Sequence, residues 1–214
     1  MIPKQIRSYV LREGRMTPAQ RRSLDIHWKS YGIEPEDIGE TKDVFTSPLT
    51  VEIGFGMGDS LLEMAISYPE RNFLGIEVHR PGVGHLLMGI HDNAISNLRI
   101  VRADGLSVLK EHLPASSVAI LQLFFPDPWP KKKHHKRRLI NPAFLDVAAN
   151  VLGAEGIIHI ATDWANYAEE IRDCLNSDHR FAQTTPPDRA LTKYEKRGVK
   201  LGHEVADIAY CLDK

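Results

Sequence analysis

The chain alternates between two hydrophobic patterns, and this alternation constrains its fold more than any other feature. Between about residues 49 and 175, each short apolar run is followed by a segment with helical periodicity. Strands that alternate with helices in this way form a parallel sheet covered by helices on both faces. We therefore expect an α/β protein with a doubly wound, mostly parallel sheet. The expected strands are residues 49–55, 73–78, 98–103, 118–125 and 156–162, and the expected helices are residues 59–68, 81–94, 105–112, 142–152 and 165–175.

The two ends of the chain depart from this pattern. Residues 1–45 are rich in Arg, Lys and Glu, so we interpret them as a basic N-terminal arm with a short helix at 17–31, ahead of a sheet domain at 46–214. Such an arm could contact phosphates or simply be solvated, and both readings stay open. Two late strands, at 181–184 and 204–212, are expected around a polar loop. The arginines of the arm are Arg7, Arg12, Arg15, Arg21 and Arg22.

Composition limits the class of protein further. A chain of 214 residues, 43% hydrophobic and 26% charged, is ordinary for one globular domain. Cys174 and Cys211 form no CxxC pair, and His134 and His135 are adjacent, so we expect no metal site. A reducing cytoplasm is the expected compartment. No apolar run approaches the roughly 20 residues that span a bilayer, so we expect no membrane association.

A glycine loop follows the first expected strand. Gly54, Gly56 and Gly58 lie between that strand and the next helix, where glycines allow a tight turn and a close ligand. Glu52 precedes them and would repel a pyrophosphate. The loop therefore favours a cationic cofactor with an amino-acid portion, such as S-adenosylmethionine. NAD and a nucleoside triphosphate are the alternatives, although no Walker lysine follows the glycines, and a glycine loop alone can be only a turn.

Acidic residues end the next two strands. Glu77 closes the second strand, where a carboxylate can accept hydrogen bonds from ribose hydroxyls. Asp104 closes the third strand and could hold an adenine amino group. Because ligands of such sheets bind beyond the carboxyl ends of the strands, these residues strengthen the prediction of a cofactor site.

A proline-rich turn follows the fourth strand and holds Asp127 between Pro126 and Pro128. We expect this carboxylate across the sheet from the glycine loop, although an Asx-type turn would also explain it. Six of the eight residues at 131–138 are Lys or Arg, a density suited to phosphates. A solvated charge run is the alternative. The candidate RNA contacts are Lys132, Lys133, Lys136, Arg137 and Arg138.

Two polar segments lie further along the chain. Asp163 ends the fifth strand and can face the same crevice, or can cap the helix that follows. Residues 192–198 combine a hydroxyl, cations and a carboxylate, which suits recognition of a base edge. An ordinary exposed loop would look similar.

Several of these segments also occur together in one known family. Over about residues 5–212, the chain resembles the bacterial tRNA (guanine-N7-)-methyltransferases, enzymes that methylate guanine 46 in the variable loop of tRNA. The resemblance implies a Rossmann-like methyltransferase fold with a late antiparallel strand. The segments that carry it are residues 52–58, 75–79, 103–104, 126–132, 134–139, 192–195, 197–198 and 201–203.

The resemblance also implies roles for individual residues. Glu52, Glu77, Asp104 and Asp127 would surround S-adenosylmethionine, with Asp127 as the catalytic residue. The protein would act on tRNA as a monomer or a homodimer. A non-catalytic RNA-binding protein on the same fold is the alternative function, followed by a nicotinamide-dependent oxidoreductase and a methyltransferase for protein or small molecules. The implied tRNA contacts are Lys131, Asp163, Thr192, Lys193, Tyr194 and Glu195.

Overall fold

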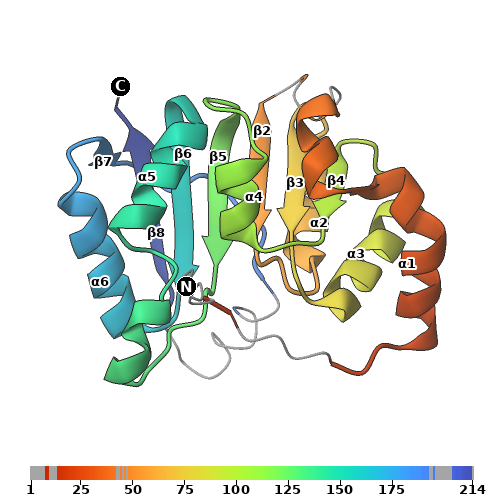
Figure 1. Cartoon of the computed structure of the whole chain (residues 1–214), viewed down its shortest axis with the longest axis horizontal. Helices are drawn as coiled ribbons and strands as arrows, with labels where there is room; N and C mark the ends of the chain where they lie inside the picture. The colour runs from red at the N-terminus through yellow and green to blue at the C-terminus, as the bar shows by residue number, and fades with distance from the viewer. Residues whose placement is uncertain are drawn as a thin grey trace, which may run out of the picture.

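A computed structural model describes residues 8–9, 14–41, 44, 46, 48–192, 195 and 204–213. These residues include an eight-stranded sheet in the order β1-β4-β3-β2-β5-β6-β8-β7 (Figure 1). All pairs from β1 to β6 are parallel, and β8 is antiparallel to both β6 and β7. The expected fold, with its late antiparallel strand, is confirmed. The strands are β1 (Gly32–Ile33), β2 (Leu49–Ile53), β3 (Asn72–Ile76), β4 (Leu98–Val101), β5 (Val118–Phe124), β6 (Leu152–Thr162), β7 (Phe181–Gln183) and β8 (Ala206–Leu212).

The helices begin where the sequence supplies capping residues. Thr17 and Gln20 form a capping box at the start of α1, and the Asp104 side chain accepts a hydrogen bond at the start of α4. Asn141 caps α5 in the same way. The helices are α1 (Pro18–Tyr31), α2 (Asp59–Ser67), α3 (Arg80–Asp92), α4 (Gly105–Glu111), α5 (Pro142–Val151) and α6 (Ala165–Asn176), with 3₁₀ segments η1 (Pro35–Glu40) and η3 (Lys132–Arg137). No helix in the described part of the chain combines the length and apolar character that crossing a bilayer requires.

Two hydrophobic cores lie on opposite faces of the sheet. Side chains of β3 alternate between them, since Leu74 and Ile76 belong to one cluster and Phe73 to the other. The larger cluster includes buried residues of α4, α5 and α6, and Figure 1 shows α4 and α5 in front of the central strands. The smaller cluster includes α2 and α3, with α1 packed against it. Burial on both faces explains the continuous apolar runs of the central strands.

The described part of the N-terminal arm is built into this fold. α1 lies along α3, so closely that a Cβ atom on Gly84 would approach the carbonyl oxygen of Gln20 to 2.5 Å. β1 extends the sheet beside β4, and Ile33 and Ile38 are buried. The segment from α1 to η1 therefore packs as part of the domain, although its sequence predicted a basic arm.

Candidate active site

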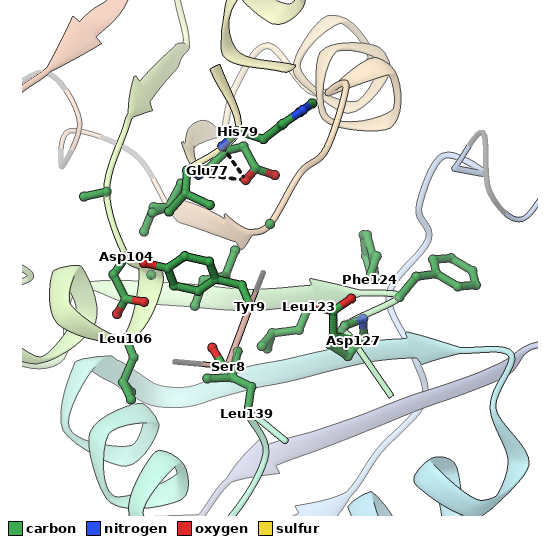
Figure 2. A pocket seen from close by; sticks show the side chains of 18 residues that line it. Ser8, Tyr9, Glu77, His79, Asp104, Leu106, Leu123, Phe124, Asp127 and Leu139 are labelled. Carbon is green, nitrogen blue, oxygen red and sulfur yellow. Dashed lines mark hydrogen bonds between the residues drawn. The ribbon is translucent and has the colours of Figure 1, made fainter. Parts of the chain in front are cut away.

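A pocket of about 290 Å³ lies beyond the carboxyl ends of β2, β3 and β5 (Figure 2). Three predicted site carboxylates line it, namely Glu77, Asp104 and Asp127, together with Gly54 of the glycine loop. Because β5 pairs directly with β2, Asp127 follows the strand next to the glycine loop. Our expectation that it lies across the sheet from that loop is therefore wrong, since strand order depends on contacts that chain order does not reveal.

The glycine loop needs its glycines for two different reasons. Gly54, Gly56 and Gly58 have φ angles of +76°, +60° and +79°, a region that other residues rarely adopt. A Cβ atom on Gly54 or Gly56 would meet no atom within 4 Å, whereas one on Gly58 would lie 2.8 Å from Leu86. The first two glycines thus leave open space where a ligand can approach the backbone, and the third allows α2 to pack against α3.

Glu77 joins the glycine loop to the pocket. Its carboxylate accepts hydrogen bonds from the backbone N–H groups of Gly56 at 2.9 Å, Val78 at 2.7 Å and His79 at 2.9 Å, and the last two are dashed in Figure 2. A carboxylate offers about four acceptor positions. One position therefore stays available for a ligand donor, while the bond from Gly56 holds the glycine loop and those from Val78 and His79 hold the segment that leads into α3.

Asp104 shares the pocket with two residues that the sequence did not indicate. Its Oδ1 atom accepts a hydrogen bond from the backbone of Ser107 at 2.9 Å, and Figure 2 shows Tyr9 beside it. Ser8 and Tyr9 line the pocket from the N-terminal segment. The Trp129 indole donates to the Ser8 carbonyl at 2.9 Å. An isolated aromatic residue in a basic arm carries no pattern that would have predicted this position.

The turn that carries Asp127 has an unusual backbone. Phe125 and Trp129, on either side of Asp127, have φ angles of +53° and +43°, in the left-handed region that non-glycine residues rarely adopt. The Phe125 N–H donates to the Ala161 carbonyl at 2.7 Å. Asp127 itself is exposed at the rim of the pocket. Neighbouring elements thus hold the turn in a shape that presents this carboxylate.

The cationic segment divides into two parts. Four lysines are exposed, and they are Lys131, Lys132, Lys133 and Lys136. The Arg137 guanidinium stacks 3.7 Å from the Trp129 ring centre and donates to the Tyr9 carbonyl at 3.3 Å. Arg138 is 4% exposed, pairs with Glu170 and donates to the Pro128 carbonyl at 2.8 Å. The lysines therefore face solvent, while this geometry gives Arg138 a structural role in the turn and does not support its predicted RNA contact.

Glu52 lies outside the pocket lining. Its side chain is buried, and the Oε2 atom has no hydrogen-bond partner among the described residues. Burial, followed by repulsion from Glu77, raises the pKa of Glu52 to about 8, although the positive charge of Arg189 opposes the rise. Glu52 pairs in register with Gln122, and Gln122 with His159, so three buried polar residues form a row across the sheet.

The sequence singled out Glu52, but Gln122 and His159 were missed. Both polar atoms of the Gln122 side chain and the His159 Nδ1 atom also have no hydrogen-bond partner among the described residues. Buried polar groups of this kind call for water or a ligand. The available signal was a polar residue within an otherwise apolar stretch, Gln122 in β5 and His159 in β6, which an analysis of periodicity does not single out.

The remaining predicted substrate residues lie beyond β6. Asp163 is exposed directly after that strand, although it does not line the pocket. The Thr192 hydroxyl accepts a hydrogen bond from the Glu195 backbone at 3.1 Å. Glu195 is 6% exposed and pairs with Arg189. Lys193 and Tyr194 lie outside the described residues.

The chemistry of the pocket fits S-adenosylmethionine. Three carboxylates line it, and none of the described residues that line it is a Lys or Arg. Such a site attracts a cationic ligand and would repel the pyrophosphate of a dinucleotide. Gly54, which lines the pocket, also leaves open space beside its backbone. Among the described residues, no three side chains of the metal-binding types gather in one place.

Comparison with solved structures identifies the class of fold. The 16S rRNA methyltransferase KamB matches with a TM-score of 0.59 and 15% identity, covering 82% of this chain and 93% of that one. A variant of the 16S rRNA (adenine(1408)-N(1))-methyltransferase from Catenulisporales acidiphilia, solved with its cosubstrate S-adenosylmethionine, matches with a TM-score of 0.57 and 14% identity, covering 85% and 92%. The fold is thus that of the S-adenosylmethionine-dependent methyltransferases.

Sequence comparison identifies the family. A family model described as "Putative methyltransferase" matches residues 46–208. A tRNA (guanine-N(7)-)-methyltransferase from Halorhodospira halophila is 46% identical, over 98% of this chain and 96% of that protein. One from Alkalilimnicola ehrlichii is also 46% identical, over 97% and 92%. The chain therefore belongs to the bacterial tRNA (guanine-N7-)-methyltransferase family, as the sequence motifs predicted, and uses S-adenosylmethionine.

Proposed function

We propose that this protein transfers a methyl group from S-adenosylmethionine to N7 of guanine 46 in the variable loop of tRNA. The observation that carries the proposal is the turn after β5. There, Asp127 lines an acidic pocket while four exposed lysines follow within a few residues. A cationic cofactor and a polyanionic substrate can thus meet at one place. The names of relatives 46% identical over nearly the whole chain support the same reaction.

The chemistry of the substrate base determines what the protein has to contribute to the reaction. Guanine N7 carries a free lone pair, so no residue has to remove a proton before attack. S-adenosylmethionine supplies an electrophilic methyl group on its sulfonium centre. The protein's contribution is then mainly positioning, which can lower a barrier by roughly 7–11 kcal/mol when the geometry is well held.

Named residues can provide this positioning. Asp127 or Asp163 accepts hydrogen bonds from the N1–H and amino group of guanine, which turns N7 toward the methyl group. The same carboxylate favours the positive charge that develops on the ring. Lys131 holds O6 or a nearby phosphate. Exposing an interior base costs a few kcal/mol of stacking, which the phosphate contacts of the exposed lysines help to offset.

The biological setting follows from the substrate. We place the reaction in the cytoplasm, where tRNA is the partner, and expect a monomer or a homodimer. Glu77 and Asp104 hold the cofactor in this scheme, with Gly54 and Gly56 giving it access to the backbone.

The direct test is methylation of unmodified tRNA with labelled S-adenosylmethionine, followed by reduction and aniline scission to map N7-methylguanine. Label at guanine 46, and no label in a tRNA that carries adenine there, supports the proposal. Label at another guanine would refute the assigned position. Binding of tRNA with no methyl transfer would instead support the alternative of a non-catalytic RNA-binding protein.

A further inference from the structure

One buried arginine connects three parts of the molecule at the active-site end of the sheet. The Arg189 side chain is 5% exposed. It forms two contacts with the Glu195 carboxylate, at 2.5 and 2.9 Å, and two with Asp207 Oδ2, at 3.0 and 2.8 Å. Paired contacts from a planar guanidinium define direction as well as distance. Glu195 and Asp207 are therefore held in fixed positions relative to each other.

The first connection leads to the polar loop that the sequence assigned to substrate. The Glu195 backbone N–H donates to the Thr192 hydroxyl at 3.1 Å, which links these two residues. The Glu195 carboxylate faces Arg189 and is almost fully buried. The Glu195 carboxylate is thus occupied by its contacts with Arg189. Of the two residues, Thr192 is the more accessible to a substrate.

The second connection leads to the sheet. Asp207 is the second residue of β8 and pairs in register with Ala161 of β6. Its Oδ1 atom lies 2.5 Å from the Nε2 atom of the buried His159. Burial alone would raise the pKa of Asp207, but hydrogen bonds with His159 and Arg189 outweigh burial and hold this pKa below its ordinary value. Asp207 thus stays ionised and anchors Arg189.

The third connection leads to the pocket. The Arg189 guanidinium lies 4.9 Å from the ring centre of Phe124, the last residue of β5 and a lining residue of the pocket. Phe124 is followed by Phe125, Pro126 and Asp127. A displacement of Arg189 would therefore change the position of Thr192 and Glu195, and also that of the strand end that leads to Asp127.

We propose that Arg189 is a positioning residue for methyl transfer, which holds Thr192 and Glu195 against the end of β5 so that the substrate base and Asp127 are correctly aligned. Glu195 acts through Arg189 in this scheme and does not read the base itself. The inference rests on the proposed function, because the family resemblance implies that Thr192 contacts the tRNA substrate.

The test compares Arg189→Met with the unaltered protein in single-turnover methylation and in cofactor binding. We expect turnover to fall about 10- to 100-fold, as for a small misplacement of reacting groups. The dissociation constant of S-adenosylmethionine should stay within about twofold, since Arg189 does not line the pocket. Arg180→Met is the matched control, because Arg180 also pairs with two carboxylates, Asp178 and Asp146, but precedes β7 at the opposite end of the sheet. It should keep full turnover.

A double-mutant cycle distinguishes positioning from direct contact. If Glu195 acts through Arg189, Glu195→Gln and Arg189→Met should each lower turnover, and the double variant should be no worse than the poorer single variant. Independent losses that multiply would show that Glu195 contacts the substrate and would overturn the inference. So would near-normal turnover in Arg189→Met, or a loss of cofactor affinity as large as the loss of turnover.

Two further controls keep the result interpretable. If Arg189→Met does not fold, Arg189→Lys replaces it, because lysine keeps the charge but cannot make the paired contacts. We then expect the same pattern with a loss of about tenfold, and unchanged turnover would count against the inference. Failure of the unaltered protein to methylate tRNA would refute the proposed function. If the unaltered protein methylates tRNA and the Arg189 variants keep normal turnover, only this inference is refuted.

Discussion

The three carboxylates of the pocket are engaged in different ways. Glu77 accepts three backbone hydrogen bonds, and Asp104 caps a helix. Asp127 is exposed at the rim, in a turn whose backbone is strained on both sides. Backbone strain beside a residue at a pocket rim is typical of a functional site. Asp127 is therefore the best candidate for a direct part in the chemistry.

Replacement of Asp127 by alanine should affect the reaction more than RNA binding. We expect the single-turnover rate to fall about 100-fold or more, because the charged base no longer has this acceptor, while tRNA affinity changes little. Rapid-quench methylation and filter binding measure the two effects. Asp25→Ala, at an exposed position of α1, is the control. A near-normal rate in Asp127→Ala would remove this residue from the chemistry.

The buried Glu52 should make stability depend on pH. Its pKa is about 8 in the folded protein, against 4.5 for the ordinary group, so the folded state retains a proton that the unfolded state releases between these values. Stability must then fall as pH rises from about 4.5 to about 8. In Glu52→Gln this loss disappears, so its melting temperature relative to the unaltered protein should increase from pH 6 to pH 8.5.

Thermal unfolding at several pH values provides the measurement. Glu111→Gln, at an exposed position of α4, should show a difference in melting temperature that does not change with pH. A constant difference for Glu52→Gln would show that this carboxyl is already ionised at neutral pH.

At the scale of elements, the segment around η3 should bind phosphates of the tRNA. Replacing Lys132, Lys133 and Lys136 together by glutamine should weaken tRNA binding and flatten its salt dependence, by roughly 0.7–0.9 in the slope of log K against log salt for each phosphate that is no longer neutralised. Binding titrations at several salt concentrations check this. The combined Lys29→Gln and Lys110→Gln variant removes exposed charges from α1 and α4 and should keep the original slope. Equal slopes for both variants would rule out η3 as the phosphate-binding segment.

Most elements could be predicted from periodicity and capping signals. The expected helix at residues 17–31 is found at Pro18–Tyr31, and the expected strand at 118–125 is found at Val118–Phe124. Glu77, Asp104 and Asp127, which line the pocket, were singled out because they lie at or shortly after strand ends. The roles of Arg138 and Glu195 could not be predicted in this way. Whether a charged side chain faces RNA or an internal partner depends on three-dimensional packing.

At the scale of the whole molecule, the packing of the N-terminal segment also could not be predicted from the sequence. Its charge suggested an arm, but Ile33 and Ile38 are buried in the larger core and β1 completes the edge of the sheet. Two residues do not form a recognisable strand pattern, so only the tertiary structure reveals β1. The same holds for Ser8 and Tyr9, which reach the pocket from far away in sequence.

Removal of residues 1–33 should therefore destabilise the protein and not merely weaken RNA binding. The deletion strips α1 from α3 and removes Ile33, and burial of one such side chain contributes about 1.5–3 kcal/mol. We expect a melting temperature at least about 5 °C lower, measured by circular dichroism. Asp25→Ala, at an exposed position of α1, is the control and should leave the melting temperature nearly unchanged. Equal stability of the truncated and the unaltered protein would show that α1 is dispensable for folding.

The left-handed residues on either side of Asp127 have a consequence for how such an enzyme can change. Their conformation is imposed from outside, through the carbonyl of Ala161 and the guanidinium of Arg138. An inherited change at Arg138 would therefore resemble damage to the proposed catalytic group, although Arg138 does not line the pocket. Evolution can adjust reactivity there by small backbone rotations and leave every ligand contact untouched.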